Sequence, residues 1–399
     1  MLTHLDPSGS YALYLHIPFC RRRCSYCAFY AEPCNSASRA KIQEYHAILL
    51  RELTDVTRTL QNPFETIYIG GGNPGLLTID EIRTLLCQAH VHTDAVECTM
   101  EINPGSLTAS HEQLFDVGLN RLSIGIQSMH ERHLRTLGRE ATVAVNRKAL
   151  ALVRDMKKRN QFRLNLDLMT CIPGQSIADA IRDIDIILEE AEPDHLSVYN
   201  LTVEEGTSLA RAVDAQTIHI IDEDSQYEML SACWNHLKTC GFSQYEIANF
   251  SISHDHRSQH NQRYWSLKDY IGLGASAAGT LSTPDGRAIR TTSVASVDTY
   301  LRQPPWQSYS YELLTKHDLM LELILVGLRT HDGIDTQAFR DCFGVEFSHV
   351  FSKTIEKLSA QRPPLLRYQR GAYALTEQAF MLLDTLVLSF AEELDDTAP

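Results

Sequence analysis

The sequence predicts an α/β protein whose parallel sheet curls around a polar cavity. Six segments of alternating apolar and polar residues recur in the first half of the chain, and stretches of helical period separate most of them. Several of these strands have a polar face, although strands covered by helices on both sides are normally apolar throughout. The six segments are residues 11–17, 66–70, 96–103, 121–128, 163–169 and 195–201.

The helical stretches between the strands show capping signals. Thr78 and Glu81 have the spacing of a capping box, and so do Ser110 and Gln113. Strands that alternate with helices favour a parallel sheet with helical crossovers over the alternative, a half-solvated antiparallel sheet.

Polar side chains near the carboxyl ends of the strands indicate where a site lies. Glu101, Gln127 and Asp167 occupy such positions on the polar face of the third, fourth and fifth strands. Barrel-type folds assemble their sites at this end of the strands, so we expect a polar ligand there.

The repeat fades after residue 205. Residues 241–281 are rich in aromatic residues, His and Gly and predict irregular structure, whereas the helical period returns from about residue 311. Two short apolar runs around Gln369, Arg370 and Gly371 indicate a hairpin between helices. We expect a winged-helix-like module that packs or docks, because the tail is acidic, although such modules often bind DNA.

Composition restricts the partners and the compartment. The 399 residues carry a formal net charge of -14 without a dense basic run, which argues against nucleic acid. No apolar run is long enough to span a bilayer and no secretory signal precedes the first strand, so the sequence predicts a cytoplasmic protein without a membrane span. Its 10 cysteines are then expected to be thiols or metal ligands.

Three of those cysteines lie close together after the first strand. Cys20, Cys24 and Cys27 fall within eight residues, a spacing that lets one loop bind several irons of a 4Fe-4S cluster and leaves one iron open. Zinc is the main alternative, but no second ligand pair stands at a zinc-like spacing. Cys34 follows Pro33 and is interpreted as a free thiol.

The ordered motifs of the chain resemble those of the radical S-adenosylmethionine enzymes. The cysteine motif, GGGNPG at 70–75, EINPGSLT at 101–108, LGRE at 137–140 and HNQRYW at 260–265 carry the resemblance over most of the chain. It implies a partial (β/α)6 TIM-type barrel over residues 1–205, an irregular segment closing the site over 206–310, and a helical, winged-helix-like domain over 311–399.

The resemblance also implies a 4Fe-4S cluster on Cys20, Cys24 and Cys27 and a site for S-adenosyl-L-methionine. Asn73 departs from the family pattern, which usually has threonine there. The implied contacts to S-adenosyl-L-methionine come from Tyr14, Tyr26, Gly71, Gly72, Asn73, Glu101, Gln127, Arg139 and Asp167.

The motifs are similar to the branch that holds oxygen-independent coproporphyrinogen III oxidases and HemW-type heme chaperones. The oxidases carry a further cysteine two residues beyond the third, where this chain has Phe29, and a longer N-terminal stretch. The resemblance therefore implies a heme chaperone that passes heme to an acceptor protein. The alternatives are a coproporphyrinogen III dehydrogenase and a radical enzyme with another substrate.

The HNQRYW segment is the expected heme site. His260 is the expected iron ligand, with His254 and His256 as alternatives, while Tyr264 and Trp265 offer faces to the macrocycle. An electron donor such as flavodoxin or ferredoxin is a further expected partner.

Overall fold

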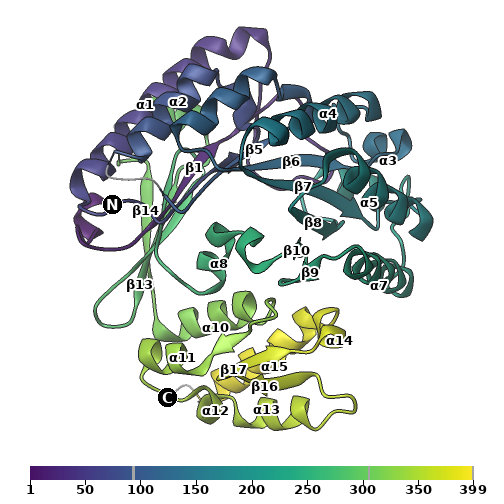
Figure 1. The fold of residues 1–399 in the computed structure, drawn as a ribbon. Coiled ribbons are helices and arrows are strands. Elements are labelled where there is room, and N and C mark those ends of the chain that lie inside the picture. The colour runs from purple at the N-terminus through teal and green to yellow at the C-terminus, as the bar shows by residue number, and fades with distance from the viewer. Residues whose placement is uncertain (92–94, 304–305, 398–399) are drawn as a thin grey trace.

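The six predicted strands lie side by side in one sheet (Figure 1). The structure is a computed structural model that describes residues 1–91, 95–303 and 306–397. All six strands run parallel in the order β1-β4-β5-β6-β7-β8, which excludes the antiparallel alternative. Their bounds are β1 Ala12–Ile17, β4 Thr66–Gly71, β5 Glu97–Ile102, β6 Arg121–Gln127, β7 Arg163–Thr170 and β8 His195–Asn200.

Helices cover the outer face of this curled sheet (Figure 1). The apolar positions of the strands point towards these helices and form the buried core. The open partial barrel is therefore confirmed, with an apolar outer face and a polar inner face. The covering helices are α1 Arg39–Thr59, α2 Ile79–Ala89, α3 Glu131–Thr136, α4 Val143–Arg159 and α5 Ile177–Ala191.

One of the two predicted capping boxes is present. Thr78 accepts a hydrogen bond from the Glu81 amide, and the Glu81 side chain bonds back to residue 78, as predicted. The box predicted at Ser110 is wrong, because the 3-10 helix Ala109–Val117 begins earlier and is capped by Thr108 with His111. Short 3-10 helices also span Leu2–His4, Ser36–Ser38, Pro74–Leu76, Pro104–Ser106 and His254–His256.

The segment 206–310 is regular, so the prediction of irregular structure there is wrong. Its strands extend both edges of the large sheet: β11 pairs parallel with β1, and the others pair antiparallel. These strands are only two to six residues long, which explains why the sequence shows no clear strand period there. The elements are α6 Ser208–Asp214, α7 Glu223–Thr239, β9 Ser243–Gln244, β10 Asn249–Ser251, α8 Gln259–Trp265, β11 Tyr270–Leu273, β12 Ala278–Ser282, β13 Ala288–Ser293, α9 Val297–Arg302 and β14 Tyr309–Leu314.

Helix α8, which carries HNQRYW, closes the barrel at the end where the strands begin. Glu97, the first residue of β5, accepts hydrogen bonds from the amides of Gln259 (3.1 Å) and His260 (3.0 Å). Arg263 is buried and pairs with Glu65, immediately before β4. The segment thus plugs the end of the barrel opposite to the carboxyl ends of the strands.

The C-terminal region is helical and contains the predicted hairpin. Strands β16 and β17 are joined at Arg370 and Gly371, which have φ values of 54° and 80°, the left-handed conformation that tight hairpins use. No helix in the described part of the chain combines the length and apolar character of a membrane span. The elements are α10 Lys316–Gly327, β15 Ile334–Asp335, α11 Thr336–Phe343, α12 Phe347–Val350, α13 Ser352–Ser359, β16 Leu366–Gln369, β17 Ala372–Leu375, α14 Glu377–Phe380 and α15 Leu383–Thr397.

Candidate functional site

The three clustered cysteines lie on the loop that follows β1. Cys20 ends strand β2 (Phe19–Cys20), and Cys24 and Cys27 follow before strand β3 (Glu32–Pro33); all three are free and partly buried. Burial, together with the neighbouring thiols of Cys24 and Cys27, raises the pKa of Cys20 to about 12, although Arg139 opposes this shift. The thiols therefore face one shared space beside a guanidinium group.

The spacing of the thiols argues against a single zinc ion. Zinc binds thiolates at about 2.3 Å, so two of its sulfur ligands lie no more than about 4.6 Å apart. Among the described residues, the only three potential ligands whose atoms all lie within 4.8 Å of one another are His130, His133 and Asp183. At least two of the clustered thiols are thus too far apart for one zinc ion, whereas a cube of four irons binds cysteines at separate corners.

The cysteine loop is tied to the rest of the barrel at Ser25. The Ser25 amide donates to the carbonyl of Leu137 (2.9 Å), and its own carbonyl accepts from the amide of Leu209 (2.8 Å). Gly138 makes this approach possible, because a Cβ atom at that position would lie 2.9 Å from the Ser25 nitrogen. The LGRE motif therefore holds the cysteine loop in place.

Glycines at the end of β4 allow the chain there to lie close to β1 and β2. A Cβ atom on Gly71, whose φ is +109°, would lie 2.6 Å from the ring of His16, and one on Gly72 would lie 2.7 Å from the carbonyl oxygen of Phe19. These positions require glycine for packing and leave the backbone accessible at the carboxyl end of the strand.

Two partly buried carboxylates line the polar interior. Glu101 accepts hydrogen bonds from the Tyr68 hydroxyl (2.6 Å) and the Gly71 amide (3.2 Å), and burial raises its pKa to about 7. Asp167 accepts from Asn165 (2.8 Å) and Ser123 (3.2 Å), and burial raises its pKa as well. Both carboxylates are held by neutral donors, and neither forms a direct ion pair with a cation among the described residues.

Arg139 lies between the cysteines and these carboxylates. Its guanidinium donates to the Sγ atom of Cys24 (3.4 Å), to the side-chain oxygen of Asn103 (3.0 Å) and to the carbonyl of Gly125 (2.7 Å). Gln127, at a bulge of β6, has a positive φ of 67°. That strained backbone directs its amide across Gly125 towards Arg139.

Three polar atoms around this space are buried without a partner. They are Nε of Arg139, Oε1 of Gln127 and Nε2 of His16, within the described residues. Buried polar atoms are normally hydrogen-bonded, so this cluster indicates that a polar ligand completes the site. Three thiols, a guanidinium and two carboxylates fit a 4Fe-4S cluster together with a ligand that carries an amino and a carboxylate group.

The remaining predicted contacts differ in what they do. The Tyr14 hydroxyl bonds Nδ1 of His16 (2.9 Å), and Tyr26 lies near Arg139 and the cysteines, where burial raises its pKa. Asn73 is buried and braces neighbouring loops, since it donates to Ser106 (2.8 Å) and accepts from the amide of Asn103 (3.2 Å). Its side chain is thus already used within the protein.

Sequence reasoning missed His16, Tyr68 and Asn103 as parts of this site. His16 alternates with Tyr14 and Tyr68 alternates with Gly70, so both belong to the inward-facing set that the strand period defines. Asn103 directly follows β5. The alternation that indicated Glu101 was therefore also the signal for the first two.

The predicted heme residues do not share one space. His260 is fully buried, and its ring nitrogens bond Thr66 (2.8 Å) and Tyr264 (2.6 Å). Burial lowers its pKa to about 3, and iron ligation would require one of these bonds to break. Trp265 packs against Tyr245, with ring centroids 5.9 Å apart. Of the three predicted heme residues, only Tyr264 lines a large cavity.

A curled parallel sheet with three free cysteines after its first strand and a polar interior defines a radical S-adenosylmethionine protein. The Radical SAM superfamily model matches residues 14–187, and the model of the HemN C-terminal domain matches residues 314–382.

Relatives that match most of this chain identify the branch. The protein is similar to the heme chaperone HemW of Escherichia coli (35% identity, covering 70% of this chain and 73% of the relative). It is also similar to HemW of Lactococcus lactis (28% identity, covering 96% and 97%). The chain belongs to the HemW-type heme chaperone family of the radical S-adenosylmethionine superfamily. The solved structure of coproporphyrinogen III oxidase HemN from Escherichia coli shares the fold, with a TM-score of 0.78 over 98% of this chain and 92% of that one at 19% identity.

Proposed function

We propose that this protein is a cytoplasmic heme chaperone that binds heme and transfers it to an acceptor protein. The observation that carries the proposal is its similarity to proteins named heme chaperones, one of which it matches over 96% of its length. Phe29 supports the same choice, because the oxidases that the sequence resembles have a cysteine there.

The proposed chaperone holds a 4Fe-4S cluster on Cys20, Cys24 and Cys27. When bound, the cluster supplies one-electron chemistry and an iron with an open position. Arg139 supports this assignment, since its guanidinium donates to the Sγ atom of Cys24 and would place a positive charge beside the cluster.

S-adenosyl-L-methionine is the proposed exchangeable ligand next to the cluster. The Glu101 carboxylate would accept hydrogen bonds from its ammonium group, and Arg139 would pair with its carboxylate. Asp167, whose oxygens already accept from Asn165 and Ser123, would accept from ribose hydroxyls. Gln127 would satisfy its unpartnered Oε1 on the same ligand.

An acidic one-electron carrier such as flavodoxin or ferredoxin is the proposed electron donor. Arg21, Arg22 and Arg23 are exposed on the cysteine loop, although the whole chain has a net charge of -14. A local basic patch next to the cluster would attract an acidic carrier and speed its association.

The proposal is tested by anaerobic reconstitution with iron and sulfide, then heme titration and transfer of heme to apomyoglobin. Replacing Cys20, Cys24 or Cys27 by Ala should abolish the cluster, whereas Cys34→Ala should keep it. The protein should release no carbon dioxide from coproporphyrinogen III in the presence of S-adenosyl-L-methionine and a reductant. Release of carbon dioxide would replace the chaperone by the dehydrogenase.

A further inference from the structure

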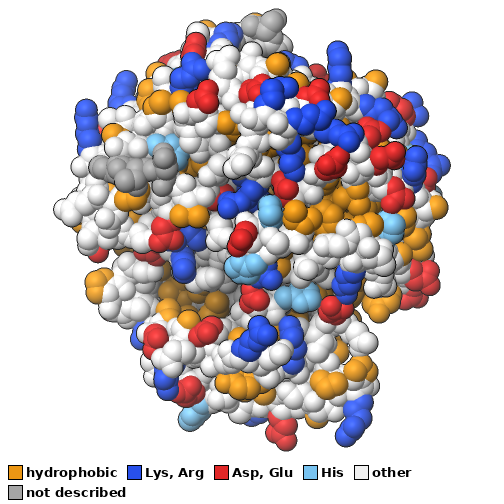
Figure 2. Space-filling model, in the orientation of Figure 1, with side chains coloured by type: hydrophobic (Ala, Val, Ile, Leu, Met, Phe, Trp, Pro, Cys, Tyr) orange, Lys and Arg blue, Asp and Glu red, His pale blue; other side chains and the backbone are white. Residues whose placement is uncertain are grey.

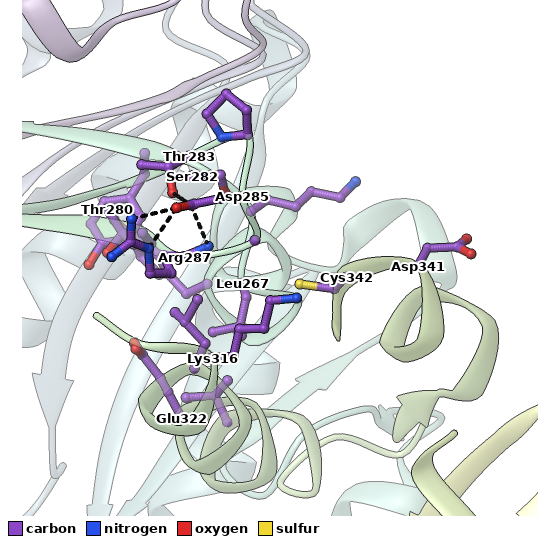
Figure 3. Close-up of a pocket in the computed structure, with 18 of the residues that line it drawn as sticks. Leu267, Thr280, Ser282, Thr283, Asp285, Arg287, Lys316, Glu322, Asp341 and Cys342 are labelled. Carbon is purple, nitrogen blue, oxygen red and sulfur yellow. Dashed lines mark hydrogen bonds and ion pairs between the residues drawn. The ribbon is translucent and has the colours of Figure 1, made fainter. Parts of the chain in front are cut away.

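A large cavity shares only Tyr14 with the predicted cofactor contacts described above. It has a volume of about 720 Å³ and opens between the antiparallel strands β11 to β13 and the helices α10 and α11 (Figure 3). Figure 2 shows a hollow with hydrophobic side chains between the body of the molecule and its C-terminal region. Ligand pockets typically measure about 300 to 1,000 Å³, so this cavity has room for a large organic ligand.

The walls of the cavity are largely apolar. Tyr264 and Tyr270 line one side as an edge-to-face pair, with ring centroids 4.6 Å apart. Leu319 and Val326 of α10 line the cavity from the C-terminal region. Aromatic and aliphatic side chains from two separate elements suit a flat, apolar ring system.

Basic side chains stand along the same cavity, and two of them are free of ion pairs. Arg287 pairs with Asp285 (2.5 Å), as Figure 3 shows, and the Glu322 carboxylate is taken by Arg290 (2.7 Å). Lys268 and Lys316 have no ion-pair partner within 4.0 Å among the described residues, while Asp341 adds one acidic group at the rim. Two available ammonium groups favour a ligand with carboxylates at its edge.

One further group indicates that the cavity is built for a ligand. Thr280 lines it and is 9% exposed, and its Oγ1 atom has no hydrogen-bond partner in the described structure. The Lys316 side chain extends towards Cys342 at the rim (Figure 3). A buried hydroxyl without a partner is costly unless a ligand or water satisfies it.

We infer that heme binds in this cavity, with its ring between the tyrosine pair and α10 and its propionates at Lys316 and Lys268. The inference rests on the proposed function and adds the location of the ligand. Heme would lie beside Tyr264 and would not contact His260, whose ring is hydrogen-bonded to Thr66 and Tyr264 and does not line the cavity.

Two matched pairs of variants of the full-length, reconstituted protein test this location by heme titration. Val326→Trp fills the cavity, whereas Leu325→Trp places the same ring on the neighbouring position, which is 48% exposed and does not line it. Val326→Trp should weaken heme binding by about tenfold or more, with Leu325→Trp within about twofold of the unaltered protein.

The second pair changes charge instead of volume. Lys316→Glu should weaken binding by about tenfold or more, because it replaces a charge-assisted contact by repulsion. Lys357→Glu, at an exposed position of α13, should leave binding unchanged. The cluster spectrum and thermal unfolding report whether each variant is folded; if Val326→Trp is not, the lysine pair decides.

The outcomes separate the location from the function. If the unaltered protein binds no heme, the proposed function fails and the location fails with it. If it binds heme and Val326→Trp and Lys316→Glu match their controls, heme binds elsewhere and only the inference about this cavity is overturned.

Discussion

Replacing Gly138 by alanine should release the cysteine loop without touching a cysteine. Gly138 has a φ of +66°, where an L-residue costs about 1 to 2 kcal/mol. The new Cβ atom would lie 2.9 Å from the Ser25 nitrogen, whose hydrogen bond to Leu137 would break at a cost of about 1 kcal/mol. Together these effects amount to about 2 to 3 kcal/mol, and the second acts directly on the loop between Cys24 and Cys27.

Gly174→Ala is the matched control for this prediction. Gly174 has a φ of +77°, but no heavy atom lies within 4 Å of its added Cβ, so it carries the backbone cost without the contact. Iron per protein after reconstitution, and the rate at which a chelator removes it, are the measurements. We expect Gly138→Ala alone to hold less iron and lose it faster. Equal iron content and equal loss rates in the two variants would refute the role assigned to Gly138.

The remaining predictions concern buried titratable groups. Burial raises the pKa of Glu101 to about 7, so the ligand-free protein should lose stability as the pH rises from about 4.5 through 7. S-adenosyl-L-methionine should bind more weakly below pH 7, because the Glu101 carboxyl is then protonated. Glu101→Gln should remove the pH dependence of that binding in calorimetric titrations. Glu52→Gln is the control: it alters a carboxyl with a similarly raised pKa that accepts a hydrogen bond from Tyr300, and it should retain the pH dependence. His260→Ala should lower the free energy of unfolding in urea by about 2 to 4 kcal/mol, because it leaves two partners unpaired, while iron content stays unchanged. The exposed control His254→Ala should unfold like the unaltered protein. Equal stability of the His260→Ala and His254→Ala variants would contradict the role of α8 in closing the barrel.

The parallel half of the fold was predictable because its signals are local. Each strand from β1 to β8 in the parallel set carries its own alternation, and the helices between them force the parallel arrangement. The strands β9 to β14 gave no comparable signal, since they are only two to six residues long and do not alternate regularly with helices. The close approach of β11 and β12 was equally hidden: a Cβ atom on Gly272 would lie 1.9 Å from the carbonyl oxygen of Ala278, a constraint that only the folded sheet reveals.

The candidate site shows the same division. Glu101 and Asp167 were predictable from strand alternation, and the cysteines from their spacing. The position of HNQRYW was not predictable, because its polar residues are typical of a protein surface. Their partners Glu97 and Thr66, each the first residue of a strand, are known only from the structure. The cavity was equally hidden, since its walls come from strands and helices that meet only in three dimensions.

Tyr14 connects the two proposed binding sites physically. Its ring borders the large cavity, while its hydroxyl bonds His16, whose ring lies against Gly71 in the cofactor site. A ligand that moves Tyr14 from one side therefore changes the surroundings of the other ligand. Thermodynamic linkage makes such coupling reciprocal: if S-adenosyl-L-methionine alters the affinity for heme by some factor, heme alters the affinity for S-adenosyl-L-methionine by the same factor. If both ligands bind as proposed, the occupancy of the cofactor site would therefore alter the affinity for heme, although no single residue contacts both ligands' reactive atoms.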